Sequence, residues 1–127
     1  MDFIFIEDMR VDAKVGIYPR ERVRAQTLEI SMTFGVPDDA ARTDDIDATI
    51  SYADVIERIR DELGRRHFNL LETLGEFVIG LMLEDFGAPW VKISIAKVGV
   101  MAGVKRVGVS IARARDGVSA LDLPDPR

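Results

Sequence analysis

Residues 26–36 form the clearest strand pattern of the chain: from Leu28 onward, apolar side chains alternate with polar ones or glycine, and this alternation constrains the fold more than any other feature. The apolar positions are Leu28, Ile30, Met32, Phe34 and Val36. Glu29, Ser31 and Thr33 point the other way. A period of two predicts a strand with one buried and one wetter face, as in an antiparallel sheet. Residues 3–15 also read as a strand, in which the predicted buried face carries Met9, Val11, Ala13 and Val15.

Two helical patterns occupy the middle of the chain. Ser51 is the predicted N-cap of the first helix, with Asp54 as its capping-box partner. Its apolar residues recur at helical spacing: Tyr52, Val55, Ile56, Ile59 and Leu63. Asn69 is the predicted cap of the second helix, with Glu72 three residues later. The second helix has a broad apolar stripe: Leu70, Leu71, Leu74, Phe77, Val78, Leu81 and Met82.

Two more strands are predicted at residues 90–98 and 107–113, with a turn over 16–24 and a loop over 99–106. The order ββααββ favours an α+β fold over βαβ winding. It predicts a four-stranded antiparallel sheet with two helices on one face. We expect a single domain over residues 1–115 and a flexible tail over 116–127.

Composition removes several classes of function. The 127-residue chain carries a net charge of −5, which argues against binding nucleic acid through its phosphates. No apolar run approaches the roughly 20 residues of a membrane span, and no signal peptide is apparent. The absence of cysteine excludes disulfides, thiolate catalysis and Cys-ligated zinc. The expectation is a cytoplasmic protein with neither nucleic-acid nor membrane partners.

Lys97 interrupts its own pattern. Val91, Ile93 and Ile95 share one face of their strand, and Lys97 continues that row. A partly desolvated lysine is suited to proton transfer near neutral pH. The alternative is a lysine at a strand end whose amine extends to water, and the pattern alone favours this alternative.

Four other residues have a structural and a chemical interpretation. Glu72 is explained by helix capping, although a carboxylate there could accept paired N–H donors from an aminopyrimidine-like ring. Glu21 lies in a charged turn and would ordinarily be solvated. Tyr52 could be a core aromatic or carry a proton on its hydroxyl. His67, the only histidine, is expected to interact with a helix C-terminus rather than to act as a catalyst.

Charged clusters give weaker signals. Asp44, Asp45 and Asp47 do not follow the spacing of a calcium loop, so a solvated turn is expected. Lys105 and Arg106 are candidates for contact with an anionic substrate.

Four segments in order resemble bacterial dihydroneopterin aldolases: DFIFIEDMRVDAKVGIYPRER, DDIDATISYADVIERI, HFNLLETLGEFV and WVKISIAKVGV. The resemblance covers residues 2–113. It implies the tunnelling fold, in which chains associate into an oligomeric barrel. It also implies retro-aldol cleavage of 7,8-dihydroneopterin in folate biosynthesis, without a cofactor, a metal or a Schiff base. The implied assembly is a ring of four subunits that stacks into a homo-octamer, with sites between neighbours.

The resemblance implies a role for each of three catalytic residues. Lys97 matches the general acid/base of the family. Tyr52, contributed by the adjacent chain, matches a tyrosine that helps to move the proton of the substrate side chain. Glu21 matches an acidic residue close to the reacting side chain.

The resemblance also implies the substrate-binding residues. Glu72 matches the carboxylate that anchors the pterin ring, beside the Leu71 backbone. Ile17 and Ile50 match walls of the pterin pocket. The chain departs from the family at Val98, since a proline usually follows the catalytic lysine.

Two alternatives to the aldolase remain open. An epimerase of dihydroneopterin or its triphosphate would use the same proton chemistry and reclose the bond, with Lys105 and Arg106 available for phosphates. A ring scaffold that binds pterin without turnover is the alternative from a different class. A scaffold has no need for Glu21, Tyr52, Glu72 and Lys97 together.

Overall fold

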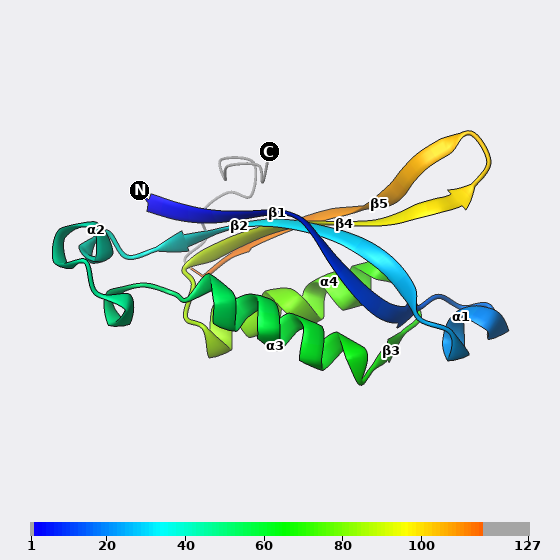
Figure 1. Cartoon of the computed structure of the whole chain (residues 1–127), viewed down its shortest axis with the longest axis horizontal. Helices are drawn as coiled ribbons and strands as arrows, with labels where there is room; N and C mark the ends of the chain where they lie inside the picture. The colour runs from blue at the N-terminus through cyan, green and yellow to red at the C-terminus, as the bar shows by residue number, and fades with distance from the viewer. Residues whose placement is uncertain (1, 116–127) are drawn as a thin grey trace.

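The computed structural model describes residues 2–115, which form two layers, a curled sheet and a pair of helices on one of its faces (Figure 1). The tail expected at 116–127 lies outside the described residues. This architecture confirms the predicted α+β class and the placement of both long helices on one face.

The sheet has five strands, one more than predicted. They are β1 (Asp2–Val15), β2 (Gln26–Val36), β3 (His67–Phe68), β4 (Trp90–Met101) and β5 (Val104–Ala114). Their order is β3-β1-β2-β4-β5, and the four long strands pair antiparallel. The fifth strand, β3, has only two residues and pairs parallel with Lys14 and Val15 at the end of β1.

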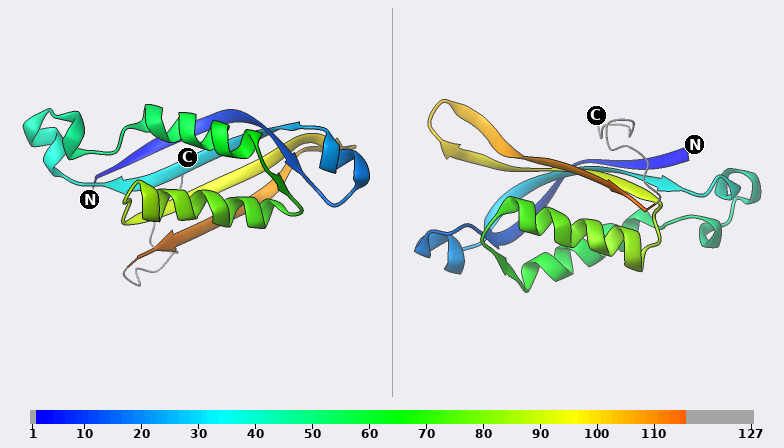
Figure 2. Two further views of the ribbon diagram at one scale, coloured as in Figure 1. Left: turned by 90° about the horizontal axis from the view of Figure 1, so that it is seen from below. Right: turned by 180° about the vertical axis from the view of Figure 1, so that it is seen from behind.

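Two long helices cover the same face of the sheet, as Figure 2 shows from below. They are α3 (Tyr52–Gly64), which packs on β1, and α4 (Leu71–Gly80), which packs on β4 and β5. The short elements are α1 (Pro19–Val23), α2 (Asp39–Thr43), a 3₁₀ turn (Ile46–Ala48) and a π-helical turn (Leu81–Asp85). No helix among residues 2–115 is long and apolar enough to cross a bilayer.

The core lies between the helices and the sheet. The apolar row predicted for residues 26–36 is fully buried from Leu28 to Phe34, and Val91, Ile93 and Ile95 of β4 are equally buried. The helices contribute Val55, Ile59, Leu63, Leu74, Val78 and Met82. Burying a side chain of this size stabilises the fold by roughly 1.5–3 kcal/mol, so the core fixes the register of every long strand.

A β-bulge interrupts β1. The pairing with β2 shifts register between Ile6 and Met9, and Asp8 adopts a left-handed backbone with φ of 52°. The extra residue changes which alternate positions face the helices. Ile4 and Ile6 therefore pack against the core before the bulge, and Met9 does so after it.

One predicted helix cap is confirmed and the other is wrong. The Ser51 hydroxyl accepts a hydrogen bond from the Asp54 backbone N–H at 3.4 Å. The second helix begins at Leu71 after the N-cap Leu70, whose side chain makes no capping bond, so Asn69 is not the cap. Because Phe68 pairs with β1, the chain is still extended when it reaches Leu70.

Two segments predicted as turn or loop contain regular structure. The predicted turn at 16–24 holds the helix α1, which has Pro19 at its first position. The predicted loop at 99–106 is a hairpin, because β4 continues to Met101 and β5 starts at Val104. Gly103, with φ of 79°, supplies the left-handed residue of the connecting turn.

The face of β2 that points away from the helices is less exposed to solvent than predicted. Ser31 and Thr33 are buried although they point away from the helices. Thr33 lies between longer side chains, since it pairs with Phe5 on one side and Lys92 on the other. Ser31 accepts a hydrogen bond from the Asp8 backbone N–H at the bulge of β1.

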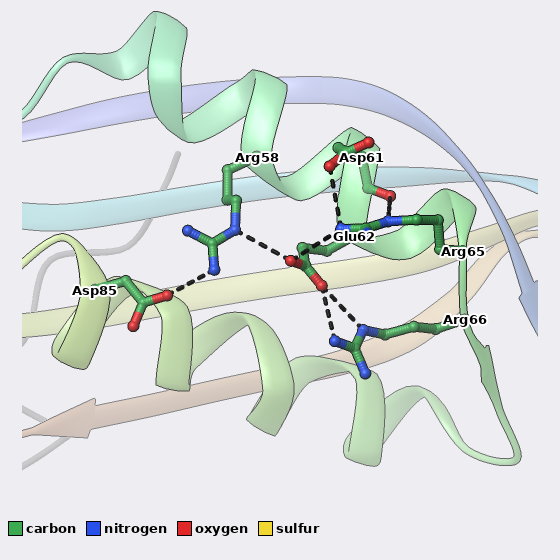
Figure 3. Close-up of polar contacts among 6 residues, drawn as sticks. All are labelled: Arg58, Asp61, Glu62, Arg65, Arg66 and Asp85. Atoms are coloured by element: carbon green, nitrogen blue, oxygen red, sulfur yellow. Dashed lines mark hydrogen bonds and ion pairs between the residues drawn. The ribbon is translucent and has the colours of Figure 1, made fainter.

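An ionic cluster connects α3 to the π-helical turn that follows α4 (Figure 3). The Glu62 carboxylate, only 10% exposed, accepts hydrogen bonds from Arg58, Arg65 and Arg66. Arg58 also donates a hydrogen bond to Asp85 at 2.7 Å, which connects α3 to the π-helical turn. The hydrogen bond from Arg66 is the largest cause of a pKa of Glu62 below its usual value.

Candidate active site

A cleft of about 680 Å³ opens where the end of β1, α1, the start of α4 and the β4–β5 hairpin meet. This volume is within the range of small-molecule sites. In Figure 1 these elements gather at the right-hand end of the molecule. Five of the seven site residues that the sequence singled out line the cleft: Ile17, Glu21, Leu71, Glu72 and Lys97.

Lys97 lies at the wall of the cleft, at the end of the buried row of β4. Its Nζ contacts Glu21 Oε2 at 2.8 Å, and the two side chains are only 16% and 15% exposed. An ion pair of this length holds the Lys97 amine inside the cleft. The geometry therefore favours a Lys97 placed for proton transfer, in place of the amine that extends to water.

Glu21 is bonded on several sides rather than solvated. Its carboxylate accepts from Lys97, from Gln26 Nε2 at 3.1 Å and from the Tyr18 backbone N–H at 3.4 Å. These bonds, led by that from Lys97, hold the pKa of Glu21 below its usual value, and burial opposes them. Glu21 is therefore ionised at neutral pH and is held in place beside Lys97.

Gly16 makes room for the Glu21 carboxylate. Its φ is 140°, and a Cβ atom there would lie 2.2 Å from Glu21 Cδ. The Gly16 N–H donates to the Phe68 carbonyl at 2.9 Å, and the Gly16 carbonyl lies 3.0 Å from Nε2 of His67. The sequence predicted that His67 interacts with a helix C-terminus, whereas the structure places it in β3, with its ring against the Gly16 carbonyl.

Glu72 lies in the first turn of α4 and lines the cleft beside Leu71. Its carboxylate bonds no other group among residues 2–115, whereas the carboxylate of Glu21 is saturated. The cleft thus holds one ion pair and one carboxylate that is available to N–H donors of a ligand. Ile17, more than half exposed, adds an apolar wall.

Two residues singled out from the sequence do not reach the cleft of this chain. Tyr52 opens α3 and is 61% exposed, in a separate apolar groove beside Phe5 and Ile56. Ile50 is buried in the core. Figure 1 shows the start of α3 well away from α1 and the hairpin.

The two basic residues considered for an anionic substrate also lie elsewhere. Arg106 faces Asp8 and Glu29, with its Nη1 at 3.8 and 4.0 Å from their carboxylate oxygens. It lines a polar hollow on the helix-free face of the sheet. Lys105 is exposed on the hairpin and does not line the cleft.

The sequence analysis missed Gln26, Arg20 and Arg24, which all line the cleft. Gln26 donates one amide to both Glu21 and the Val15 carbonyl. It could have been found by the signal that exposed Lys97, because it is a polar residue at the start of the apolar row of β2. No comparable signal marks the two arginines. Within residues 2–115, no group of three or more His, Asp or Glu side chains could hold a metal.

Comparison with known proteins connects this cleft to a family. A family model described as dihydroneopterin aldolase (FolB) matches residues 4–112. The dihydroneopterin aldolase of Escherichia coli K12 is 36% identical over 118 residues, covering 89% of this chain and 93% of that protein. The dihydroneopterin aldolase of Haemophilus influenzae is 32% identical over 115 residues, covering 89% and 97%.

Solved structures agree with the sequence relatives. The Escherichia coli dihydroneopterin aldolase, solved in complex with neopterin, superposes with a TM-score of 0.84 at 35% identity and covers 90% of this chain and all of that one. More distant structures share the fold alone, among them an archaeosine synthase of the QueF-like type with a TM-score of 0.59 at 16% identity.

Proposed function

This chain belongs to the dihydroneopterin aldolase family, and from that premise we propose that its cleft binds 7,8-dihydroneopterin and cleaves its side chain. The family consists of lyases, and a role of this chain in folate biosynthesis fits that membership. The products would be 6-hydroxymethyl-7,8-dihydropterin and glycolaldehyde. The observation that carries the proposal is the Lys97–Glu21 pair in the wall of a cleft that also presents the unbonded Glu72. We assign the reaction to the cytoplasm, as expected from the sequence.

Glu72 is the proposed anchor of the pterin ring. A carboxylate accepts two parallel N–H bonds from the amino and ring nitrogens of a 2-aminopyrimidinone. Glu72 is free to do so, and the Leu71 backbone adjoins it at the start of α4. Ile17 supplies apolar contact to the face of the ring.

The proposed chemistry uses the ring as the electron acceptor. A proton leaves the C2′ hydroxyl through Tyr52 of a neighbouring subunit or water, the C1′–C2′ bond breaks, and its electrons pass into the C6=N5 imine. Lys97 donates a proton to N5. The resulting enamine is then protonated on C1′ by the proton that left the hydroxyl, and N5 returns its proton to Lys97, which restores the imine. Since the substrate carries its own imine, the scheme needs neither a Schiff base nor a metal. Glu21 holds the Lys97 amine in position.

Tyr52 belongs to the proposal through a neighbouring subunit, as the family resemblance implies. On its side away from β2, β1 is paired only at Lys14 and Val15, where it meets β3. The strand β5 forms the opposite edge of the sheet. Open edges of this length favour strand pairing between chains, and ring closure removes them. We propose a ring of four subunits, two of which stack into an octamer, with Tyr52 of one subunit completing the cleft of the next.

Epimerisation at C2′ is the second outcome the cleft could support. The same bond cleavage followed by rotation of the aldehyde and reclosure inverts the carbon, with Lys97 and Glu21 in unchanged roles. A non-catalytic pterin scaffold would retain binding at Glu72 without either reaction.

Substitution of Lys97 tests the catalytic assignment. Lys97→Ala should lower kcat for dihydroneopterin by about 10²–10⁴-fold, the usual contribution of a general acid. Lys105→Ala, which removes an exposed lysine outside the cleft, is the matched control and should keep normal turnover. A folded Lys97→Ala protein with near-normal kcat would contradict the assignment.

A further inference from the structure

Two arginines line the cleft without a partner among residues 2–115. Arg20 lies on α1, Arg24 is the extended residue that caps the C-terminus of this helix, and both line the same cleft. Within residues 2–115, neither guanidinium bonds a carboxylate or a carbonyl. Arg22, on the same helix, differs because its Nε donates to the Ile17 carbonyl at 3.3 Å.

The cleft is positive although the chain is acidic. Lys97 and Glu21 neutralise each other, and Glu72 is offset by one arginine, so the lining residues carry one excess positive charge. The whole chain carries −5. Two unpaired guanidiniums in this setting attract an anion, and their planar donor sets match the oxygens of a phosphate.

The order of groups around the cleft indicates where that anion would lie. The proposed ring anchor, Glu72, comes from α4, and the reacting bond lies at Lys97 and Glu21. Glu21 is itself on α1, next to Arg20 in sequence and less than one turn from Arg24. The substrate side chain, passing the ion pair, would continue along α1 toward these two arginines.

We propose that Arg20 and Arg24 form a phosphate subsite, and that this enzyme accepts dihydroneopterin carrying a monophosphate on the terminal side-chain hydroxyl. This inference rests on the proposed function. The reaction balances without a co-reactant. The C1′–C2′ bond breaks as before, the C2′ hydroxyl proton is lost, and the ester at C3′ stays intact. The products are 6-hydroxymethyl-7,8-dihydropterin and glycolaldehyde phosphate.

The test compares kcat/KM for dihydroneopterin 3′-monophosphate with kcat/KM for dihydroneopterin, in the full-length protein. We expect the ratio of phosphorylated to free substrate to exceed one. In the double variant Arg20→Gln/Arg24→Gln it should fall by at least about 10-fold, since a charge-assisted hydrogen bond is lost at each site. The matched control is Arg10→Gln, which removes an unpaired arginine of β1 outside the cleft and should leave the ratio unchanged.

Three results would overturn the subsite. One is a wild-type ratio at or below one, and another is a ratio that the double variant leaves unchanged. The third is inhibition of free-substrate cleavage by added inorganic phosphate with a ratio near one, which would identify a site for free anions instead. If wild-type protein cleaves neither substrate, the proposed function has failed rather than the subsite.

Discussion

At the scale of single residues, the cleft depends on one carboxylate that three donors hold in place. Glu21 meets Lys97, Gln26 and the Tyr18 backbone, and it can do so because Gly16 has no side chain. The arrangement joins residues separated by 76 positions in sequence. Backbone geometry at Gly16 is therefore as much a part of the site as the charged groups.

Gly16→Ala should disable the site. The added Cβ would lie 2.2 Å from Glu21 Cδ on a backbone with φ of 140°, so the carboxylate must leave Lys97. We expect kcat/KM to fall by more than about 10-fold, the usual cost of removing one partner of a charged hydrogen bond. Gly64→Ala is the control, because nothing lies within 4 Å of its Cβ position. Equal activity of the two variants would show that Glu21 is not held as described.

The two catalytic-site groups differ in how far sequence could predict them. Lys97 is a charged residue in line with the apolar row of β4, so the sequence pattern alone marks it. Glu21 breaks no pattern, because a charged residue in a charged turn is ordinary and only the fold brings Lys97 to it. The role of Glu21 was indicated by the family resemblance and not by the pattern. Gln26 gives the same kind of signal as Lys97, since it is in line with the apolar row of β2, but only the fold brings it to Glu21.

At the scale of elements, periodicity predicted the long strands and helices, and local chemistry predicted their ends less well. Residues 26–36 form β2 with the predicted bounds, since one face must be buried. Asn69 has the chemistry of a cap, but pairing of β3 with β1 keeps the chain extended past it. The hairpin was missed because glycines at 99 and 103 suggested a loop, while the valines around them extend both strands.

Glu62 supports the helix pair and gives a prediction at this scale. The folded state lowers its pKa, so its stabilising effect is present above the unfolded value near 4.5 and is lost as pH falls through the lowered pKa. Glu62→Gln should lower Tm by several degrees at pH 7, because three arginines lose a shared acceptor. The gap between variant and wild type should narrow below pH 4.5.

Thermal unfolding followed by circular dichroism from pH 7 to pH 3.5 measures this difference. Glu84→Gln, which changes a carboxylate without a partner among the described residues, is the control and should match wild type at each pH. A Glu62→Gln deficit that stays constant across this range would mean that the charge of Glu62 is not what stabilises the helix pair.

At the scale of the whole molecule, one chain does not contain every residue the proposed reaction uses. Lys97 and Glu21 lie in the cleft, while Tyr52 is exposed at the N-terminal end of α3, away from the cleft. The sheet edges are open along most of β1 and along β5. The family resemblance implied this incompleteness, whereas composition and periodicity could not, because it follows from where two elements end in space.

Mixing two inactive variants tests the shared site. Lys97→Ala and Tyr52→Phe proteins, unfolded and refolded together in equal amounts, should regain activity. In random rings about a quarter of the sites pair an intact lysine with an intact neighbouring tyrosine. Each variant refolded alone is the control. No recovery, in a mixture that light scattering shows to be oligomeric, would mean that both residues act within one chain.

The most direct test of the account is product analysis with 7,8-dihydroneopterin under metal chelation. Purified protein is incubated with this substrate, and the pterins and aldehydes are separated by chromatography. The account predicts 6-hydroxymethyl-7,8-dihydropterin and glycolaldehyde in equal amounts, with no loss of rate on chelation. A side-chain isomer as the sole product, or bound pterin without any product, would contradict it.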